Sequence, residues 1–235
     1  MNEAQLRDEI CRVGQSLFDR GYVHATAGNI SVRLDASEGG GFLITPTDAC
    51  LGFLDPARLA RVDAHGQQTG GDRASKTLTL HQHIYRASAS AGAPAGCVIH
   101  THSTHCVALT LHGDSGDDLD HELLPPVTPY FVMKVGHVPV LPYHRPGDPA
   151  VATFVAQAIA RYAAQGTPLR AVMLARLGPN VWHDTPAQAM ATLEELEETA
   201  RLVSLSQGQG QGRVGPPVLS AAQLDELRQA FGARW

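Results

Sequence analysis

The sequence predicts one globular α/β or α+β domain, built around a mainly antiparallel β-sheet that is flanked by helices. Hydrophobic residues make up 43% of the 235 residues, which suits a single domain with a full core. Short β segments follow one another in the first third of the chain, and this succession suggests an antiparallel sheet. Several longer segments carry apolar residues at helical spacing. We therefore expect one domain over residues 1–206.

The individual elements follow from these periodicities. The first helix, over 3–20, has one apolar stripe and ends at Gly21, a residue typical of a helix C-cap. Further helices are expected over 78–87, 104–111, 149–164, 185–205 and 221–231. Strands are expected over 30–33, 42–44, 61–63, 97–102, 138–143 and 169–175. Prolines within 138–143 place that strand near an edge, and the proline-rich residues 123–130 predict an extended segment leading to Tyr130.

The C-terminal part of the chain is expected to be less compact. The helix over 185–205 carries a run of glutamates, which predicts a solvated face. These are Glu194, Glu195, Glu197 and Glu198. Residues 207–219 are rich in Gly, Gln and Pro and predict a flexible linker, followed by a C-terminal helix within 220–235 that is able to dock on a neighbour.

Composition and charge exclude several classes of function. The formal net charge is -5, so no basic footprint indicates nucleic acid or an anionic membrane surface as a partner. The polar N-terminus is unlike a signal peptide, and no apolar run approaches a membrane span. Four cysteines without C-x-x-C spacing are typical of reduced thiols in a cytoplasmic protein. A small-molecule ligand is the expected partner.

The segment over 97–105 has the most distinctive chemistry. It is a short apolar strand that leads to His100 and His102, and the i, i+2 spacing places both imidazoles on one face. Two imidazoles on a rigid strand make half of a divalent-metal site. The alternative is that both are ordinary polar residues at the end of a strand. The spacing alone does not decide between the two interpretations.

Three other segments have the residue types of an anion site. Gly28 and Asn29 lie in a small-residue turn before a strand, which suits an anion nest or a plain loop connection. Thr47 follows a strand end in a turn rich in hydroxyl groups. Ser75 and Lys76 precede a helix, whose N-terminus favours negative charge. Helix capping alone explains the serine but not the lysine.

In their order and spacing, four motifs together resemble the class II aldolase/adducin family over about residues 5–205. These are Thr26-Ala27-Gly28-Asn29-Ile30-Ser31-Val32-Arg33, Leu43-Ile44-Thr45-Pro46-Thr47, Ser75 before a helix, and Val98-Ile99-His100-Thr101-His102-Ser103. Other segments are most similar to the 3-oxo-tetronate 4-phosphate decarboxylase branch, which is related to fuculose-phosphate aldolase. They include Tyr143-His144-Arg145-Pro146-Gly147-Asp148-Pro149 and Glu194-Glu195-Leu196-Glu197-Glu198-Thr199-Ala200-Arg201.

The resemblance implies a three-layer α/β/α fold and a homotetramer with active sites between subunits. It also implies a lyase that cleaves a C–C bond of a phosphorylated sugar acid or ketose, releasing an aldehyde or carbon dioxide. In such enzymes a divalent metal, commonly zinc, stabilises an enediolate. Carried over by position, His100 and His102 match the metal ligands, and Tyr130 matches a proton donor that reaches a neighbouring subunit. Phosphate would be held by Gly28, Asn29, Thr47, Asp48, Ser75 and Lys76, with Asp48 standing where a glycine is usual.

Two departures from the family pattern affect the chemistry. Thr77 stands at the catalytic position of the acid/base glutamate, and Leu177 stands at the position of the third metal histidine. A leucine binds no metal, so the zinc site is expected to be weakened or absent. Three interpretations remain. Another side chain, from His24, His81, His105, His183 or a neighbouring subunit, completes the site of an active enzyme. Alternatively, the chain binds phosphorylated sugars or pairs with an active homologue without turnover, or the chemistry or the alignment is shifted.

Overall fold

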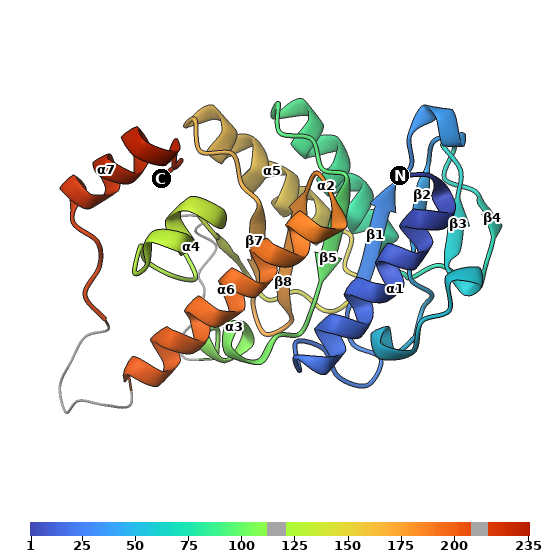
Figure 1. Ribbon diagram of the computed structural model, residues 1–235, viewed down its shortest axis with the longest axis horizontal. Coiled ribbons are helices and arrows are strands. Elements are labelled where there is room, and N and C mark those ends of the chain that lie inside the picture. The colour runs from blue at the N-terminus through green and yellow to red at the C-terminus, as the bar shows by residue number, and fades with distance from the viewer. Residues whose placement is uncertain (112–120, 208–215) are drawn as a thin grey trace.

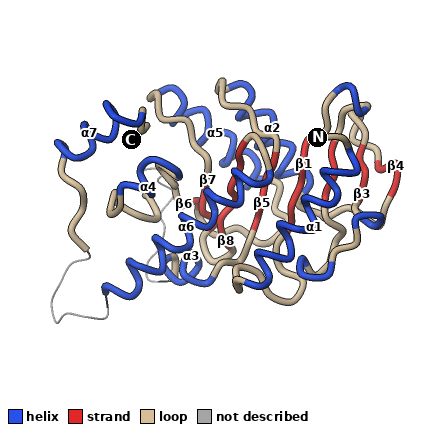
Figure 2. Tube along the Cα trace, in the orientation of Figure 1, coloured by secondary structure: helices blue, strands red, loops and turns tan. Residues whose placement is uncertain are grey.

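The computed structural model describes residues 1–111, 121–207 and 216–235. Its centre is an eight-stranded sheet in the order β4-β3-β2-β1-β5-β8-β7-β6 (Figures 1 and 2). Neighbouring strands are antiparallel except for the pair β6–β7, which is parallel. The strands are β1 Asn29–Arg33, β2 Phe42–Ile44, β3 Ala60–Val62, β4 Gln68–Gly70, β5 Cys97–His100, β6 Val140–Leu141, β7 Ala171–Leu174 and β8 Gly178–His183.

Helices cover both faces of this sheet. One face carries α1 (Glu3–Asp19), α3 (Thr104–Leu109), α4 (Pro129–Lys134) and α6 (Pro186–Gln207), whose apolar residues form one core with the sheet. The opposite face carries α2 (Leu78–Ser90) and α5 (Ala150–Ala164), which form a second core. Figure 1 shows α1 and α6 crossing in front of the strands, with α2 and α5 on the far side. The predicted three-layer α/β/α architecture is therefore confirmed.

The central strand β5 contributes to both cores because successive side chains point to opposite faces. Cys97 and Ile99 pack in the core under α1 and α6, whereas Val98 packs in the core under α2 and α5. His100 has the same parity as Val98, so it faces α2 and α5. This alternation decides which helices surround the chemical groups at the end of the strand.

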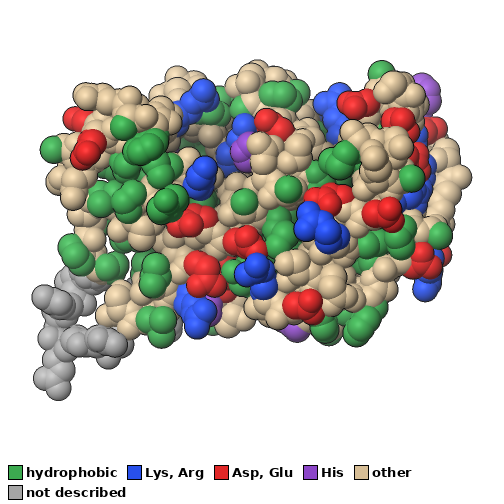
Figure 3. Space-filling view, in the orientation of Figure 1, with side chains coloured by type: hydrophobic (Ala, Val, Ile, Leu, Met, Phe, Trp, Pro, Cys, Tyr) green, Lys and Arg blue, Asp and Glu red, His purple; other side chains and the backbone are tan. Residues whose placement is uncertain are grey.

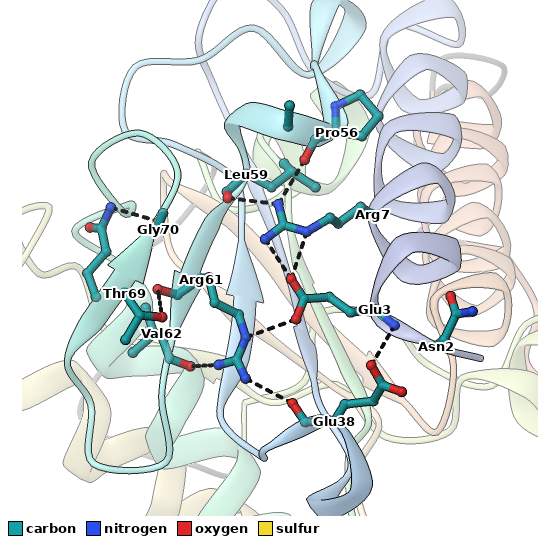
Figure 4. A network of polar contacts seen from close by, with 12 residues as sticks. Asn2, Glu3, Arg7, Glu38, Pro56, Leu59, Arg61, Val62, Thr69 and Gly70 are labelled. Carbon is teal, nitrogen blue, oxygen red and sulfur yellow. Dashed lines mark hydrogen bonds and ion pairs between the residues drawn. The ribbon is translucent and has the colours of Figure 1, made fainter.

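Helix α1 is fixed to the edge of the sheet by a network around Glu3 (Figure 4). Its carboxylate accepts hydrogen bonds from Arg7 Nε at 2.9 Å and from Arg61 Nε, on β3, at 3.1 Å. Arg7 Nη1 also donates to the carbonyl of Pro56 at 2.8 Å, and Arg61 Nη2 donates to the carbonyl of Glu38 at 3.0 Å. The network therefore links α1 to three segments of the N-terminal half of the chain.

Several predicted elements are confirmed, and others differ. Strand β8 was not predicted, because its first residues, Gly-Pro-Asn, are typical of turns. Tyr130 lies on α4 rather than at the end of an extended segment, because Pro129 is favoured at the first position of a helix. The prediction that the glutamates of α6 form a solvated face is wrong for Glu197, which is 3% exposed.

The C-terminal helix α7 (Ala221–Phe231) is present as expected and packs near α4. Leu219 N donates to the carbonyl of Pro126 at 2.8 Å, and the Trp235 ring stacks on His137 with centroids 4.2 Å apart. Most of the predicted linker, residues 208–215, lies outside the described residues. In Figure 3, charged side chains of both signs are interspersed along α1 and α6, and hydrophobic side chains gather over α4 and α7.

A membrane-spanning helix would need a long apolar stretch. Among residues 1–111, 121–207 and 216–235, no helix is both long and apolar enough to cross a bilayer.

Candidate active site

The candidate site lies where β1, β5 and β8 meet at one end of the sheet. Asn29 on β1 is paired with His100 on β5, and His100 is paired with Asn180 on β8. Side chains of directly paired antiparallel residues project to the same face. The three side chains therefore form a row on the face covered by α2 and α5, which we call the polar row.

His100 is held in one orientation. Its Nδ1 donates a hydrogen bond to the carbonyl of Pro179 at 3.0 Å, which leaves Nε2 with a free lone pair. The side chain is almost completely buried, at 8% exposure. Burial, with a further contribution from His102, lowers the pKa of His100 to about 4. The imidazole is therefore neutral near neutral pH.

His102 lies beyond the end of β5, yet its ring remains beside that of His100. The two ring centroids are 5.1 Å apart, and His24 lies on the other side of His102 with a centroid distance of 6.4 Å. Burial, followed by the nearby His24, lowers the pKa of His102. The predicted proximity of the histidine pair is confirmed, although only His100 belongs to the strand.

Below the polar row, α2 contributes His81, which is 0% exposed. Its Nδ1 is 2.7 Å from Ser31 Oγ, Ser31 Oγ is 2.9 Å from the Tyr85 hydroxyl, and that hydroxyl donates to the Ser31 carbonyl at 2.9 Å. The Tyr85 hydroxyl has one proton and donates it to the Ser31 carbonyl. All three contacts are then hydrogen bonds if Ser31 Oγ donates to the Tyr85 hydroxyl and His81 Nδ1 donates to Ser31 Oγ. Burial, followed by nearby His100, lowers the pKa of His81 to about 3.

Buried polar atoms without partners concentrate in this region. Within the described residues, Asn29 Oδ1, His81 Nε2, and both amide atoms of Asn180 are buried without a hydrogen-bond partner. Native proteins leave few such atoms unpaired. Three of these four atoms belong to the polar row, so the row has hydrogen-bonding capacity that the described residues leave unused.

The predicted anion segments lie against one another. Thr47 N donates to the carbonyl of Arg73 at 2.9 Å, and Ser75 N donates to the carbonyl of Thr45 at 3.3 Å. These bonds place the turn after β2 beside the segment that begins α2. Gly28 lies against the end of β5, where a Cβ would come within 2.9 Å of the His100 carbonyl oxygen. The structure thus brings the anion segments and the polar row to one end of the sheet.

The other site residues predicted from the sequence lie outside the polar row. Asp48 and Lys76 are exposed, and Asp48 has a positive φ of 58°, a conformation that glycine adopts more easily. Thr77 is the N-cap residue of α2, and its hydroxyl lies 2.9 Å from that of Ser75. Tyr130 is 62% exposed on α4 and makes no hydrogen bond to the other site residues in the described part of the chain.

The residues do not fit a zinc site with three protein ligands. Residues 1–111, 121–207 and 216–235 contain no group of three or more His, Cys, Asp or Glu positioned to hold a metal ion. Leu177 packs against the core under α2 and α5, so the position of the expected third ligand is apolar. A catalytic zinc normally has three protein ligands, and His100 and His102 supply two.

Four histidines of this chain are candidates to replace the missing metal ligand, namely His24, His81, His105 and His183. His183 pairs with Cys97 at the opposite end of β5, and His105 donates from Nδ1 to Glu197 Oε1 at 2.8 Å. Only His24, beside His102, and His81, on the face of the polar row, remain at this end of the sheet.

Glu197 of α6 supports the segment that follows the histidine pair. Its Oε1 accepts from His105 N at 2.9 Å, and its Oε2 accepts from Cys106 N at 3.1 Å. The buried carboxylate thus satisfies backbone N–H groups at the start of α3. This role of Glu197 is not predictable from the sequence, because a run of four glutamates is typical of a solvated surface. Asn180 was not predicted because it lies in no recognisable motif, and His81 was predicted only as a possible replacement metal ligand.

A mixed sheet in this order, with helices on both faces and histidines at the end of its central strand, defines a class II aldolase fold. The family model described as Class II Aldolase and Adducin N-terminal domain matches residues 8–204, and the chain belongs to this family.

Individual relatives are similar over the full length. The chain is 52% identical to the Cupriavidus necator 3-oxo-tetronate 4-phosphate decarboxylase, with 99% of each chain covered. It is 42% identical to the protein of the same name from Escherichia coli K12, with 96% of each covered. The crystal structure of YgbL, described as a putative aldolase/epimerase/decarboxylase from E. coli, superposes with a TM-score of 0.79 at 38% identity. That superposition covers 96% of this chain and 99% of the other.

Proposed function

We propose that the protein is a carbon–carbon lyase that decarboxylates a 3-oxo-tetronate 4-phosphate. The observation that carries the proposal is the 52% identity over 99% of both chains to a relative with that name. The arrangement of the site supports it, because the anion segments and the polar row lie at the same end of the sheet. A phosphorylated sugar acid needs both kinds of surface.

The chemistry of such a substrate defines what the site must do. The bond between C1 and C2 breaks, C1 leaves as carbon dioxide, and the electron pair moves toward the C3 oxygen to form an enediolate. A proton added to C2 then gives dihydroxyacetone phosphate. Stabilising negative charge on the C3 oxygen is the main requirement, and buried hydrogen-bond donors are effective there because they need no reorganisation. Asn180 Nδ2 is a buried donor without a partner at this site.

The proposal includes an altered metal centre. A divalent ion, zinc in the first instance, would supply an electrophile for the same oxygen in a family member with three ligands. In this chain two imidazoles remain, and loss of a ligand weakens metal affinity. We expect protein purified without added zinc to contain much less than one equivalent of metal. A full equivalent that is lost in His102→Ala would contradict the altered centre.

The direct test is release of carbon dioxide from the 3-oxo-tetronate 4-phosphate stereoisomers, coupled to detection of dihydroxyacetone phosphate. Activity that is lost in His100→Ala and retained in His65→Ala supports the proposal, because His65 lies in an exposed turn away from the site. Binding of the substrate without product, with either stereoisomer, would overturn it.

A second function is favoured by Thr77 and Leu177, since neither side chain can replace an acid/base carboxylate or a metal ligand. In this alternative the chain binds phosphorylated sugars, or pairs with an active homologue, without turnover. The substrate would then raise the melting temperature by mass action while no product forms. Thr77→Glu combined with Leu177→His would produce activity if the substrate site is intact.

We also propose a cytoplasmic homotetramer with sites between subunits. The four cysteines are free thiols, which suits a reducing compartment. Tyr130, at 62% exposure, is available to reach a neighbouring subunit. Light scattering coupled to gel filtration tests the tetramer, and a monomer at micromolar concentration would refute it.

A further inference from the structure

The polar row and His81 contain more hydrogen-bonding capacity than the protein uses. Asn29, His81 and Asn180 are 6%, 0% and 0% exposed. In the described part of the chain, four of their side-chain polar atoms have no partner. Leaving a buried donor or acceptor unpaired costs free energy, because the atom loses its hydrogen bonds to water and gains none in the protein. A group that pairs with several of these atoms at once therefore gains free energy that an exposed site would not provide.

The hydrogen-bond pattern determines whether each unpaired atom needs a donor or an acceptor from a ligand. The Tyr85 hydroxyl donates its one proton to the Ser31 carbonyl, so Ser31 Oγ donates to Tyr85, and we assign the remaining proton to His81 Nδ1, which leaves His81 Nε2 with a lone pair. It therefore requires a donor, such as a hydroxyl. Asn180 Nδ2 requires an acceptor, such as a carbonyl oxygen. An α-hydroxy ketone supplies a donor and an acceptor on adjacent carbons.

The distance to the anion segments is also suitable. His81 is four residues after Thr77 on the same helix, and four residues of α-helix rise about 6 Å along the axis. A phosphate at the start of α2 and a hydroxyl at His81 would thus be separated by about one helical turn. In a 3-oxo-tetronate 4-phosphate the C2 hydroxyl is a few bonds from the phosphate, on the far side of the ketone.

We propose that His81 and Asn180 are specificity-determining residues that recognise the hydroxy ketone of the substrate. His81 Nε2 accepts a hydrogen bond from the C2 hydroxyl, and Asn180 Nδ2 donates to the C3 oxygen. The inference rests on the proposed function and names two residues for its site. It has the consequence that substrates without the hydroxyl are rejected, because His81 Nε2 would stay buried and unpaired.

The test compares two ligands that differ only in this hydroxyl. Dihydroxyacetone phosphate retains it and hydroxyacetone phosphate lacks it, and calorimetry measures the dissociation constant of each. We expect the wild-type protein to bind dihydroxyacetone phosphate about tenfold more tightly or better, which is a typical effect of one buried hydrogen bond. Inorganic phosphate serves as the probe of the anion segments alone.

Two variants of His81 provide matched controls. In His81→Asn the amide retains a donor near the Nδ1 position and removes the Nε2 acceptor, so the ligand preference should fall to about onefold. In His81→Gln the longer side chain places an amide oxygen near the Nε2 position, and it should restore part of the preference. A His81→Asn protein that binds phosphate normally and keeps the wild-type preference would overturn the role of His81.

Asn180→Leu gives a second, independent measurement. Both ligands carry the ketone oxygen, so both should bind more weakly and their ratio should be unchanged. The melting temperature should rise, because a buried amide without partners is replaced by an apolar side chain of similar size. Unchanged affinities would overturn the role of Asn180. A wild-type protein that binds both ligands equally would refute the inference alone, whereas one that binds neither would refute the proposed function with it.

Discussion

Replacing Glu197 by glutamine is expected to lower the free energy of unfolding by about 2–4 kcal/mol. The carboxylate is 3% exposed and accepts three hydrogen bonds, from His105 N, His105 Nδ1 and Cys106 N. A glutamine has one acceptor oxygen, and its amide N–H₂ would face an N–H donor. At least one backbone N–H then loses its partner, which costs about 1–3 kcal/mol.

Loss of the negative charge adds to this cost. A carboxylate at a helix N-terminus contributes about 0.3–1 kcal/mol through the helix dipole, and hydrogen bonds to a charged acceptor are stronger than those to a neutral one. Glu197→Ala removes all three bonds, so we expect a loss of about 3–5 kcal/mol. The side chain of His105 is 34% exposed and can pair with water, so most of this cost arises at the two backbone groups.

Urea unfolding followed by circular dichroism measures both variants, with the slope of the transition as a check on two-state behaviour. Glu198→Gln is the matched control, because Glu198 lies on the same helix with a side chain 51% exposed, and a glutamine oxygen can still accept the hydrogen bond that the Tyr22 hydroxyl donates to Glu198 Oε1 at 3.2 Å. We expect that control to change stability by less than about 0.5 kcal/mol. A loss in Glu197→Gln no larger than that in the control would refute the assignment of Glu197 as the buried cap of α3.

Three further predictions concern other parts of the chain. Glu3→Gln should lower stability by about 1–3 kcal/mol because its carboxylate joins two arginines, whereas Glu9→Gln should cost under about 1 kcal/mol because Glu9 pairs with one arginine, Arg12, whose side chain is 64% exposed; equal losses in urea unfolding would contradict the role of the network. His81 has a folded-state pKa of about 3, below its ordinary value, so the unfolded chain binds one more proton and stability falls as pH decreases from about 6.5. His81→Asn should reduce the slope of stability against pH in that range by up to about 1.4 kcal/mol per pH unit, and an unchanged slope would show that His81 is not held neutral. Gly178→Ala should cost more than about 3 kcal/mol, because its Cβ would lie 1.9 Å from a backbone oxygen of the loop after β5; Gly166→Ala, with open space around it, should cost about 1 kcal/mol, and equal melting temperatures would refute the close approach.

Periodicity predicted the elements with strong local patterns. The apolar stripe of α1 and the continuous apolar residues of β7 predicted a helix and a strand at those positions. Strand β8 was missed because its identity depends on pairing with β5 and β7 rather than on its own sequence. Tertiary pairing of this kind overrides local propensity.

The candidate site, like the secondary structure, was predictable only where the signal lies within one segment of the sequence. The proximity of His100 and His102 follows from their spacing in one segment, and the structure confirms it. The positions of Asn180 and Glu197 depend on contacts between segments far apart in the sequence, which no local pattern carries. A buried glutamate on a helix that is otherwise acidic can be identified only when the groups it contacts are known.

The order of the strands has a consequence for how the site forms. Asn29 belongs to the first strand and Asn180 to the last, and both become neighbours only through β5 between them. Pairings between such distant segments form late, since the entropy of closing a long loop must be overcome first. A nascent or cleaved chain that lacks β8 therefore has the anion segments but an incomplete polar row. Ligand binding at this row would report that the whole sheet has assembled.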